Sequence, residues 1–242
     1  MKRIFTTLAL IAISVFTLQA QSFSISDGII SPGTNDDNKV GFGHRNPMLF
    51  GVGVHLPQAE GANAFVDNTT LFGNREIFFE ITSFSYSFTP STYISLSCLL
   101  DWDAYRLNSD YYWLPNNRTV APAAAAPLFS EVKKSTLRVV SFDFPLMFTQ
   151  KIGPVSLSVG AAAEINFNGR TKFKGTLADG TAVKNTREGA LRCKNIKTEI
   201  FTYNYQAILG TDDYAVYVKY NPASQFVDGP YFSYWTVGLI LR

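Results

Sequence analysis

Apolar and polar residues alternate over long stretches of this sequence, most regularly in two neighbouring segments. Along Val140–Phe148 every second residue is apolar, and Val155–Phe167 repeats the alternation. A period of two is typical of β-strands, and the turn-forming sequence Lys151–Pro154 lies between the two segments. Each segment exceeds the ~5–6 residues of a usual soluble strand and is long enough for the ~9–11 residues that cross a bilayer at a tilt. The pattern therefore predicts one long antiparallel hairpin.

The residues between the apolar positions of this hairpin help to choose between two fold classes. They are mostly Ser, Gly, Ala and Asn, with one aspartate, Asp143, and one glutamate, Glu164. A soluble β-sandwich would usually carry more Lys and Glu on its wet face. A membrane barrel instead turns its apolar face to lipid and fills its cramped interior with small and polar residues. The hairpin therefore favours a membrane barrel over a sandwich.

The same alternation predicts six further strands. They span Met48–Leu56, Glu76–Phe88, Tyr93–Tyr105, Lys197–Leu209, Tyr214–Tyr220 and Phe232–Arg242. The apolar phase reverses within the second of these segments, so we expect a β-bulge near Thr82–Ser83.

The connections between these eight strands alternate between short and long without exception. The short ones are Thr89–Ser91, Lys151–Pro154 and Gly210–Asp213. The long ones are Pro57–Arg75, Arg106–Lys134, Asn168–Ile196 and Asn221–Tyr231. Outer-membrane barrels have tight periplasmic turns and long external loops, and eight strands form the smallest usual barrel. The sequence therefore predicts an all-β fold, an eight-stranded antiparallel up-and-down transmembrane β-barrel.

The N-terminal segment Met1–Ala20 has the features of a secretory signal peptide. Two basic residues precede a short apolar run, and a small residue ends the segment. The next residue is Gln21 rather than cysteine, so we do not expect a lipoprotein. Residues Gln21–Pro47 are polar and are predicted to form a leader before the barrel at 48–242. No later run approaches the ~18 apolar residues of a membrane helix, so we expect location in the cell outer membrane.

Composition adds little beyond this fold. Aromatic residues make up 14% of the chain and the mean hydropathy is +0.04. Rings gather near both predicted ends of the strands, for example Phe88 near a tight turn and Trp102 near a long loop, as in the aromatic girdles of membrane barrels. The net charge of +2 does not indicate a nucleic-acid partner. The two cysteines, Cys98 and Cys193, are expected to be unpaired.

The predicted barrel interior collects the charged residues of the strands. These are His55, Asp101, Asp103, Asp143, Glu164 and Lys219, with Arg138 as a further candidate. Side chains fill the interior of an eight-stranded barrel. We therefore expect these groups to pair with one another and with neighbouring Ser, Asn and Gln. A path for protons or small solutes is the alternative.

The sequence contains no motif that indicates an enzyme. It has no phosphate-binding loop, no metal-spaced set of Cys and His, and no glycine-rich dinucleotide loop. Some small outer-membrane barrels modify lipids with a His, a Ser and an acidic residue, and His55 is the only strand histidine. We therefore expect a protein without cofactor or metal and without enzymatic activity, with a lipid-modifying enzyme as the alternative.

The third long loop is strongly basic. Its cations are Arg170, Lys172, Lys174, Lys184, Arg187, Arg192 and Lys194. Near an outer leaflet such charges could bind the phosphates of lipopolysaccharide. A solvated loop face is the alternative interpretation.

Two segments of this chain resemble the PorT-like outer-membrane β-barrel family. Phe142–Leu146, followed by Lys151-Ile152-Gly153, is similar to the central hairpin of that family, and Tyr217–Tyr220 followed by Trp235–Leu241 is similar to its last hairpin. The chain departs from the family in having Asp143 where Glu is more frequent, and in ending on arginine rather than an aromatic residue. The resemblance implies a small outer-membrane barrel, and some members of the family serve secretion machinery.

From these observations we predict a non-enzymatic structural or interaction protein. Its external loops, above all Arg106–Lys134 and Asn168–Ile196, would contact outer-membrane lipid and other envelope or secretion proteins. A small-solute pore or a lipid-modifying enzyme is the alternative.

Overall fold

The computed structural model describes residues 41–45, 49–59, 64–116, 118–184 and 195–241. All of them belong to one compact unit, Pro32–Arg242. The predicted signal peptide, most of the predicted leader, and Arg187, Arg192, Cys193 and Lys194 lie outside the described residues.

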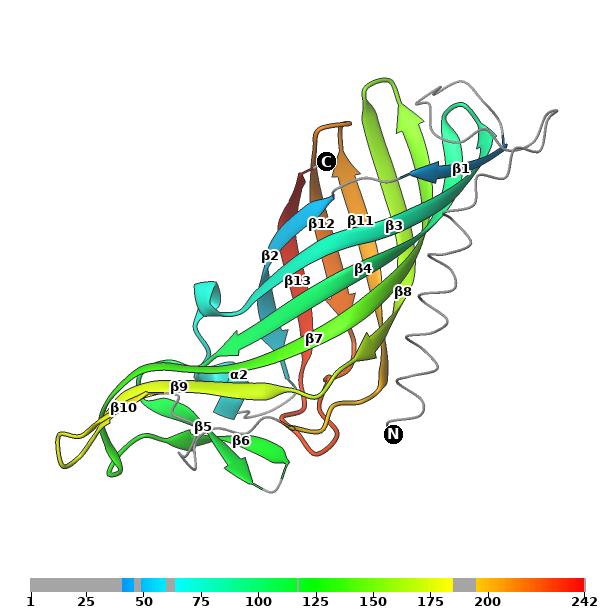
Figure 1. The fold of residues 1–242 in the computed structure, drawn as a ribbon. Helices are drawn as coiled ribbons and strands as arrows, with labels where there is room; N and C mark the ends of the chain where they lie inside the picture. Colours follow the sequence, from blue (N-terminus) through cyan, green and yellow to red (C-terminus); the bar gives the residue numbers. More distant parts are fainter. Residues whose placement is uncertain (1–40, 46–48, 60–63, 117, 185–194, 242) are drawn as a thin grey trace. The chain divides into compact units, whose positions relative to one another are not determined.

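Eight antiparallel strands close into a ring, which confirms the predicted all-β fold (Figure 1). These wall strands are β2 Phe50–Gln58, β3 Arg75–Thr89, β4 Thr92–Arg106, β7 Phe129–Ile152, β8 Val155–Asn166, β11 Phe201–Gly210, β12 Tyr214–Asn221 and β13 Ser233–Leu241. Each pairs with the next in this order. The pairing of β13 with β2 closes the ring.

The three tight connections lie at one end of the ring and the four long ones at the other (Figure 1). We call these the short-turn end and the long-loop end. At the turn between β7 and β8, Gly153 has a φ of 61°, a backbone conformation that glycine adopts without steric cost. The predicted bulge in β3 is present as a register shift between Glu80 and Thr82, one residue earlier than the expected position.

The long connections contain more regular structure than expected. They hold α2 Ala64–Asp67, the 3-10 helix η1 Leu71–Gly73, β5 Tyr111–Asn116, β6 Thr119–Ala124, β9 Arg170–Leu177 and β10 Ala182–Lys184. One more strand, β1 Gly41–Arg45, precedes the wall. No helix among the described residues is long and apolar enough to cross a membrane.

Two of the long connections, predicted as loops, form a small sheet assembly instead. Strand β7 starts at Phe129, well before the expected boundary, and its first part pairs with β9, which pairs with β10. The hairpin β5–β6 packs on this extension through a separate apolar cluster that includes Tyr112, Phe129 and Phe173. Two register shifts interrupt the β7–β9 pairing. They break the alternation of apolar and polar residues from which the extension could have been predicted.

Part of the segment predicted as a leader also forms a strand. Strand β1 lies in the segment assigned to the leader and pairs with β3 over Ser83–Ser87. Strand β2 pairs with β3 over Arg75–Phe79. The two short strands therefore share one neighbour along its length. The strand expected at Met48–Leu56 is β2, which begins and ends two residues later, at Phe50–Gln58.

Candidate functional site: the ring interior and its outer faces

One lysine lies among buried carboxylates inside the ring. The Nζ atom of Lys219 contacts Glu76, and it lies 3.1 Å from Asp101 Oδ2 and 3.5 Å from Asp143 Oδ2. Glu164 Oε1 is 3.6 Å away. All five side chains are buried. They come from β3, β4, β7, β8 and β12, so this one cluster ties most of the wall strands together.

Neutral side chains supply the hydrogen bonds that a single lysine cannot. Asn204 and Asn221 donate to Glu164 Oε1 at 2.6 and 3.0 Å. Gln206 donates to Asp143 Oδ2 at 3.1 Å, and Tyr217 donates to Glu76 Oε2 at 2.5 Å. Burying carboxylates is costly unless they are paired and hydrogen-bonded, and these donors meet that requirement for Glu76, Asp143 and Glu164. Asp101 is paired through Oδ2 with Lys219, and its Oδ1 atom has no hydrogen-bond partner among the described residues.

A second polar group lies beside this cluster. His55 Nε2 is 2.9 Å from Asp103 Oδ1, and His55 Nδ1 is 2.8 Å from Thr236 Oγ1. Gln225 donates to Asp103 Oδ2 at 2.8 Å and accepts a hydrogen bond from the Tyr105 hydroxyl at 3.1 Å. The ring of His55 also stacks on that of Tyr105, with centroids 5.2 Å apart.

The hydroxyl, imidazole and carboxylate of Thr236, His55 and Asp103 follow the order of a nucleophile, a base and an orienting acid. All three side chains are at most 3% exposed. A substrate would have to enter the ring to reach them. The arrangement therefore acts as part of the packed interior in this structure.

Three carboxylates are close enough together to consider a metal ion. One oxygen from each of Glu76, Asp101 and Asp103 lies within 4.8 Å of the others. Lys219 contacts the first two, and Gln225 and His55 contact the third. The protein's own donors thus already surround most of the oxygens that an ion would need.

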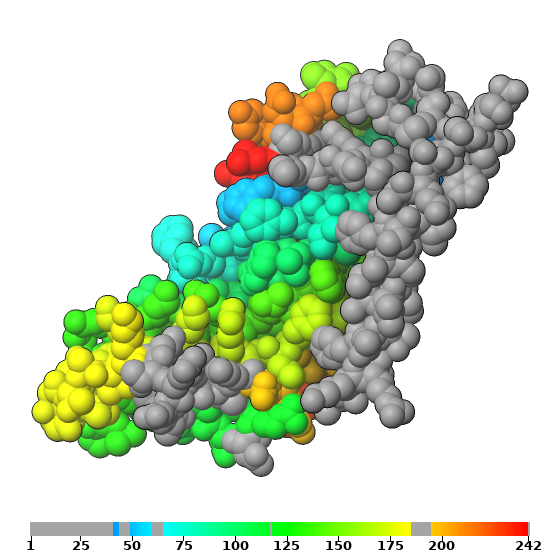
Figure 2. All heavy atoms as spheres, in the orientation of Figure 1, coloured from blue at the N-terminus to red at the C-terminus, as the bar shows by residue number. Residues whose placement is uncertain are grey.

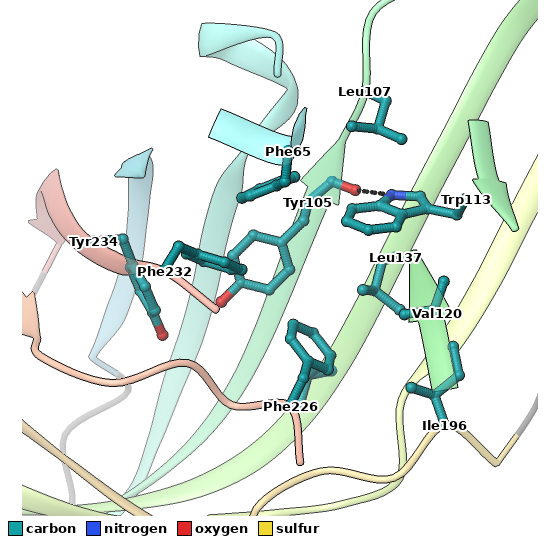
Figure 3. Close-up of a cluster of buried hydrophobic side chains, with 11 residues drawn as sticks. Phe65, Tyr105, Leu107, Trp113, Val120, Leu137, Ile196, Phe226, Phe232 and Tyr234 are labelled. Atoms are coloured by element: carbon teal, nitrogen blue, oxygen red, sulfur yellow. Dashed lines mark hydrogen bonds between the residues drawn. The ribbon is translucent and has the colours of Figure 1, made fainter. Parts of the chain in front are cut away.

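An apolar cluster closes the interior at the long-loop end, and we call it the cap (Figure 3). All four long connections contribute to it: Phe65 from the first, Trp113 and Val120 from the second, Ile196 from the third and Phe226 from the fourth. Trp113 Nε1 donates to the backbone oxygen of Tyr105 at 3.0 Å. Residues from all four long connections therefore meet at the mouth of the ring.

A second apolar cluster fills the interior toward the short-turn end. It contains Phe78, Leu99, Tyr217 and Ile240. Glycine is needed beside these rings, because a Cβ atom at Gly51 would lie 2.1 Å from the Phe78 ring. The charged interior is thus enclosed between two apolar layers.

The outside of the ring is apolar. Each of the eight wall strands exposes large apolar side chains, and we call this surface the apolar belt. Representative members, one from each strand, are Val52, Phe84, Leu96, Leu146, Val159, Leu209, Val216 and Leu239. Toward the long-loop end, the rings of Tyr220 and Trp235 on neighbouring strands lie 4.5 Å apart.

The described basic residues of the third long loop lie on two different strands, β9 and β10. Arg170, Lys172 and Lys174 alternate along one face of β9, and Thr171 and Phe173 are buried on the other. Lys184 is exposed at the end of β10.

Arg138 is a correction to the sequence prediction. It was a candidate for the interior, but it pairs in register with Arg170 on the outer face, while its neighbour Val139 is buried. Strict alternation through the outward-facing Leu146 explains this orientation, because residues of the same parity on one strand share a face.

Two interior residues were missed from the sequence. Glu76 and Tyr217 are buried and hydrogen-bonded to each other. The outward phase of Ile77 and Phe79 was a sufficient signal for Glu76. The predicted inward orientation of Lys219 was the corresponding signal for Tyr217, which lies two residues away on the same strand.

In comparisons with known proteins, no protein-family model and no curated protein matches the chain. The functional argument therefore depends on the geometry.

Proposed function

We propose that the ring is an eight-stranded transmembrane β-barrel of the cell outer membrane that acts as a non-enzymatic structural or interaction protein through its long loops. The observation that carries this proposal is that apolar side chains cover the outside of the ring and charged side chains are buried inside it, the reverse of a soluble protein. Every wall strand exposes large apolar side chains outward, while Lys219 and its carboxylates are buried inside. A contiguous exposed apolar surface of this extent is unfavourable in water and favourable against lipid.

The enclosed interior favours a structural role over a pore. The cap and the cluster around Phe78 cover the charged layer from both ends. A pore would need a continuous polar path, and a lipid-modifying enzyme would need its histidine open to the lipid. His55 is 0% exposed. Both alternatives would require the cap to move.

The loops offer the surface for a partner. They contain two apolar cores, the cap and the cluster around Tyr112, Phe129 and Phe173, so they are folded elements rather than loose connections. Function is often located on loops that a rigid scaffold positions. The exposed side chains Leu114 and Leu128 lie in this region and are suitable contact points.

Fractionation and gel mobility test the barrel. The protein should be recovered in the outer membrane, and the unboiled sample should migrate differently from the boiled one, as compact barrels do. Recovery as a soluble periplasmic protein would refute the proposal. In planar bilayers the intact chain should not conduct, and steady conductance would support the pore instead.

A loop variant separates the wall from the interaction surface. Replacing Tyr111–Ala124 by a short Gly-Ser linker should leave insertion intact, because the hydrogen bonds of the wall do not involve the hairpin backbone. A photo-crosslinker at Leu114 should capture an envelope protein, whereas one at Ile152 on the short-turn end should not. Equal capture from both positions would contradict a role of the long loops.

A further inference from the structure

A row of arginines crosses the outer face of four adjacent strands. In the register of the sheet, Arg75 on β3 lies opposite Ala104 on β4, Ala104 opposite Arg138 on β7, and Arg138 opposite Arg170 on β9. Directly opposed residues project from the same face of a sheet. Figure 2 shows this side of the molecule, with β3, β4, β7 and β9 following one another from cyan through green to yellow.

Further cations continue the row away from the apolar belt. Arg106 lies two residues beyond Ala104 on β4, and Lys134 is directly opposite Lys174. We call Arg75, Arg106, Lys134, Arg138, Arg170 and Lys174 the basic face. Across neighbouring strands such residues are ~5 Å apart, so several could contact one ligand.

The basic face begins where the apolar surface ends. One row nearer the short-turn end, Ile77, Trp102 and Val140 lie opposite one another on the same outer face. The next row contains Phe79, which is exposed, and Leu100. Along β3 and β7 the outward-facing side chains thus change from apolar to arginine within two residues. Such a change is expected where the acyl chains of a membrane end and the lipid headgroups begin.

The cations of the basic face have no carboxylate partners in the part of the chain that the structure describes. No ion pair joins any of the six to an acidic side chain there, and the Nε atom of Arg138 is buried without a hydrogen-bond partner. Like charges directly opposite one another are unfavourable. The pKa of Lys134 is accordingly lowered, by partial desolvation and by the nearby Arg138, Arg75 and Arg106. An anion at this position would relieve the repulsion.

We propose that the basic face binds the phosphate groups of an anionic lipid headgroup, with Arg75, Arg138 and Arg170 as the central contacts. The proposal rests on the proposed membrane location and adds the chemical class of ligand. Arginine presents several N–H donors in a planar fork that fits phosphate oxygens. Continuity with the apolar belt favours a lipid over a soluble phosphate, since the acyl chains would lie along Ile77, Trp102 and Val140.

Lipid retention in nanodiscs tests the proposal. The wild-type chain is placed in phosphatidylcholine nanodiscs that contain a diphosphorylated glycolipid or the same glycolipid with its phosphates removed, and bound lipid is measured by native mass spectrometry. The wild type should bind the phosphorylated form selectively. The triple variant Arg75→Gln, Arg138→Gln, Arg170→Gln should bind about a hundredfold more weakly, at roughly fivefold per charge near a lipid surface.

A matched control removes three cations elsewhere. Lys133→Gln, Lys151→Gln and Lys197→Gln take away the same charge outside the basic face, and binding should change by less than about threefold. Gel mobility before and after boiling verifies that each variant is folded. Equal binding by the arginine variant and this control would overturn the basic face as the site.

The remaining outcomes identify other ligands or a failure of the barrel. Displacement of the lipid by inorganic pyrophosphate at the same concentration would show a site for soluble phosphate and overturn the lipid assignment. Equal binding of the dephosphorylated glycolipid would exclude phosphate recognition. A wild-type chain that does not enter nanodiscs would overturn the barrel and this site together, whereas a chain that inserts but does not select phosphate would overturn this site alone.

Discussion

Two groups of charged residues lie on opposite faces of the same strands, and they are built differently. Inside, each of five carboxylates accepts at least one hydrogen bond or ion pair from Lys219 or from neutral donors. Outside, the basic face contains only cations, and no described carboxylate pairs with them. Arg75 and Glu76 are adjacent in the sequence, yet one belongs to each group.

The difference indicates what each group does. Charges whose partners are supplied within the protein stabilise one arrangement of the strands, and removing one partner leaves another charge buried and unpaired. Charges whose partners are missing raise the energy of the free protein and lower it when a ligand of opposite sign binds. We therefore infer that the interior charges have a structural role and that the basic face is a binding surface.

The largest effect should follow replacement of Lys219, the only lysine inside the ring among the residues that the structure describes. Lys219→Met leaves Glu76, Asp101, Asp143 and Glu164 without their cation. We expect the free energy of unfolding to fall by about 3–5 kcal/mol, measured by urea titration of the protein in liposomes. Lys197→Met, at an exposed site, should cost less than about 0.5 kcal/mol. Similar losses for both variants would mean that the interior cluster does not hold the strands together.

A smaller loss is expected from a charge placed on the apolar belt. Leu96→Arg or Val159→Arg should reduce the free energy of unfolding in liposomes by about 2–4 kcal/mol if these residues face the middle of the bilayer. The comparison is Leu114→Arg, which is also an exposed leucine but belongs to the loop hairpin β5–β6. Equal tolerance of arginine at all three positions would show that the belt does not contact lipid.

The sequence predicted the wall well because outward-facing and interior positions alternate with a strict period. The faces of β2 and β4, including the inward orientation of His55, Asp101 and Asp103, follow from that alternation alone. The order of short and long connections then indicated an even number of strands. These signals are local, so no knowledge of the neighbouring strand was needed.

The parts that were missed depend on contacts between distant segments. The extension of β7 is interrupted by register shifts near Phe129 and Val132, which removes the period. The cap draws single residues such as Phe65 and Phe226 from different loops, and neither segment has a regular pattern. The basic face requires the register of four strands, because Arg75 and Arg170 are far apart in the chain. The composition of the third long loop showed that it is basic, but it could not show that Arg170 aligns with arginines on other strands.

The smallest predicted effect is a gain in stability, and it tests the claim that the basic face is unfavourable when empty. Lys134 lies directly opposite Lys174. Replacing it by glutamine in Lys134→Gln should stabilise the protein by a few tenths of a kcal/mol in zwitterionic detergent, because like charges directly opposite one another are destabilising. Lys133→Gln removes a charge that is paired with Glu131 and should give no gain.

The pH dependence of this gain has a definite sign. The pKa of Lys134 is lowered in the folded protein by desolvation and by the neighbouring arginines. At pH values below the lowered pKa the side chain is protonated in both the folded and the unfolded chain, so the repulsion is fully present. As the pH rises through the lowered pKa, the folded protein loses the proton first, and the stability of the wild type increases relative to the variant. The gain from Lys134→Gln should therefore shrink toward alkaline pH, and in the presence of the diphosphorylated glycolipid it should become a loss. A gain that is independent of both pH and lipid would place its cause in local packing rather than in unmatched charge.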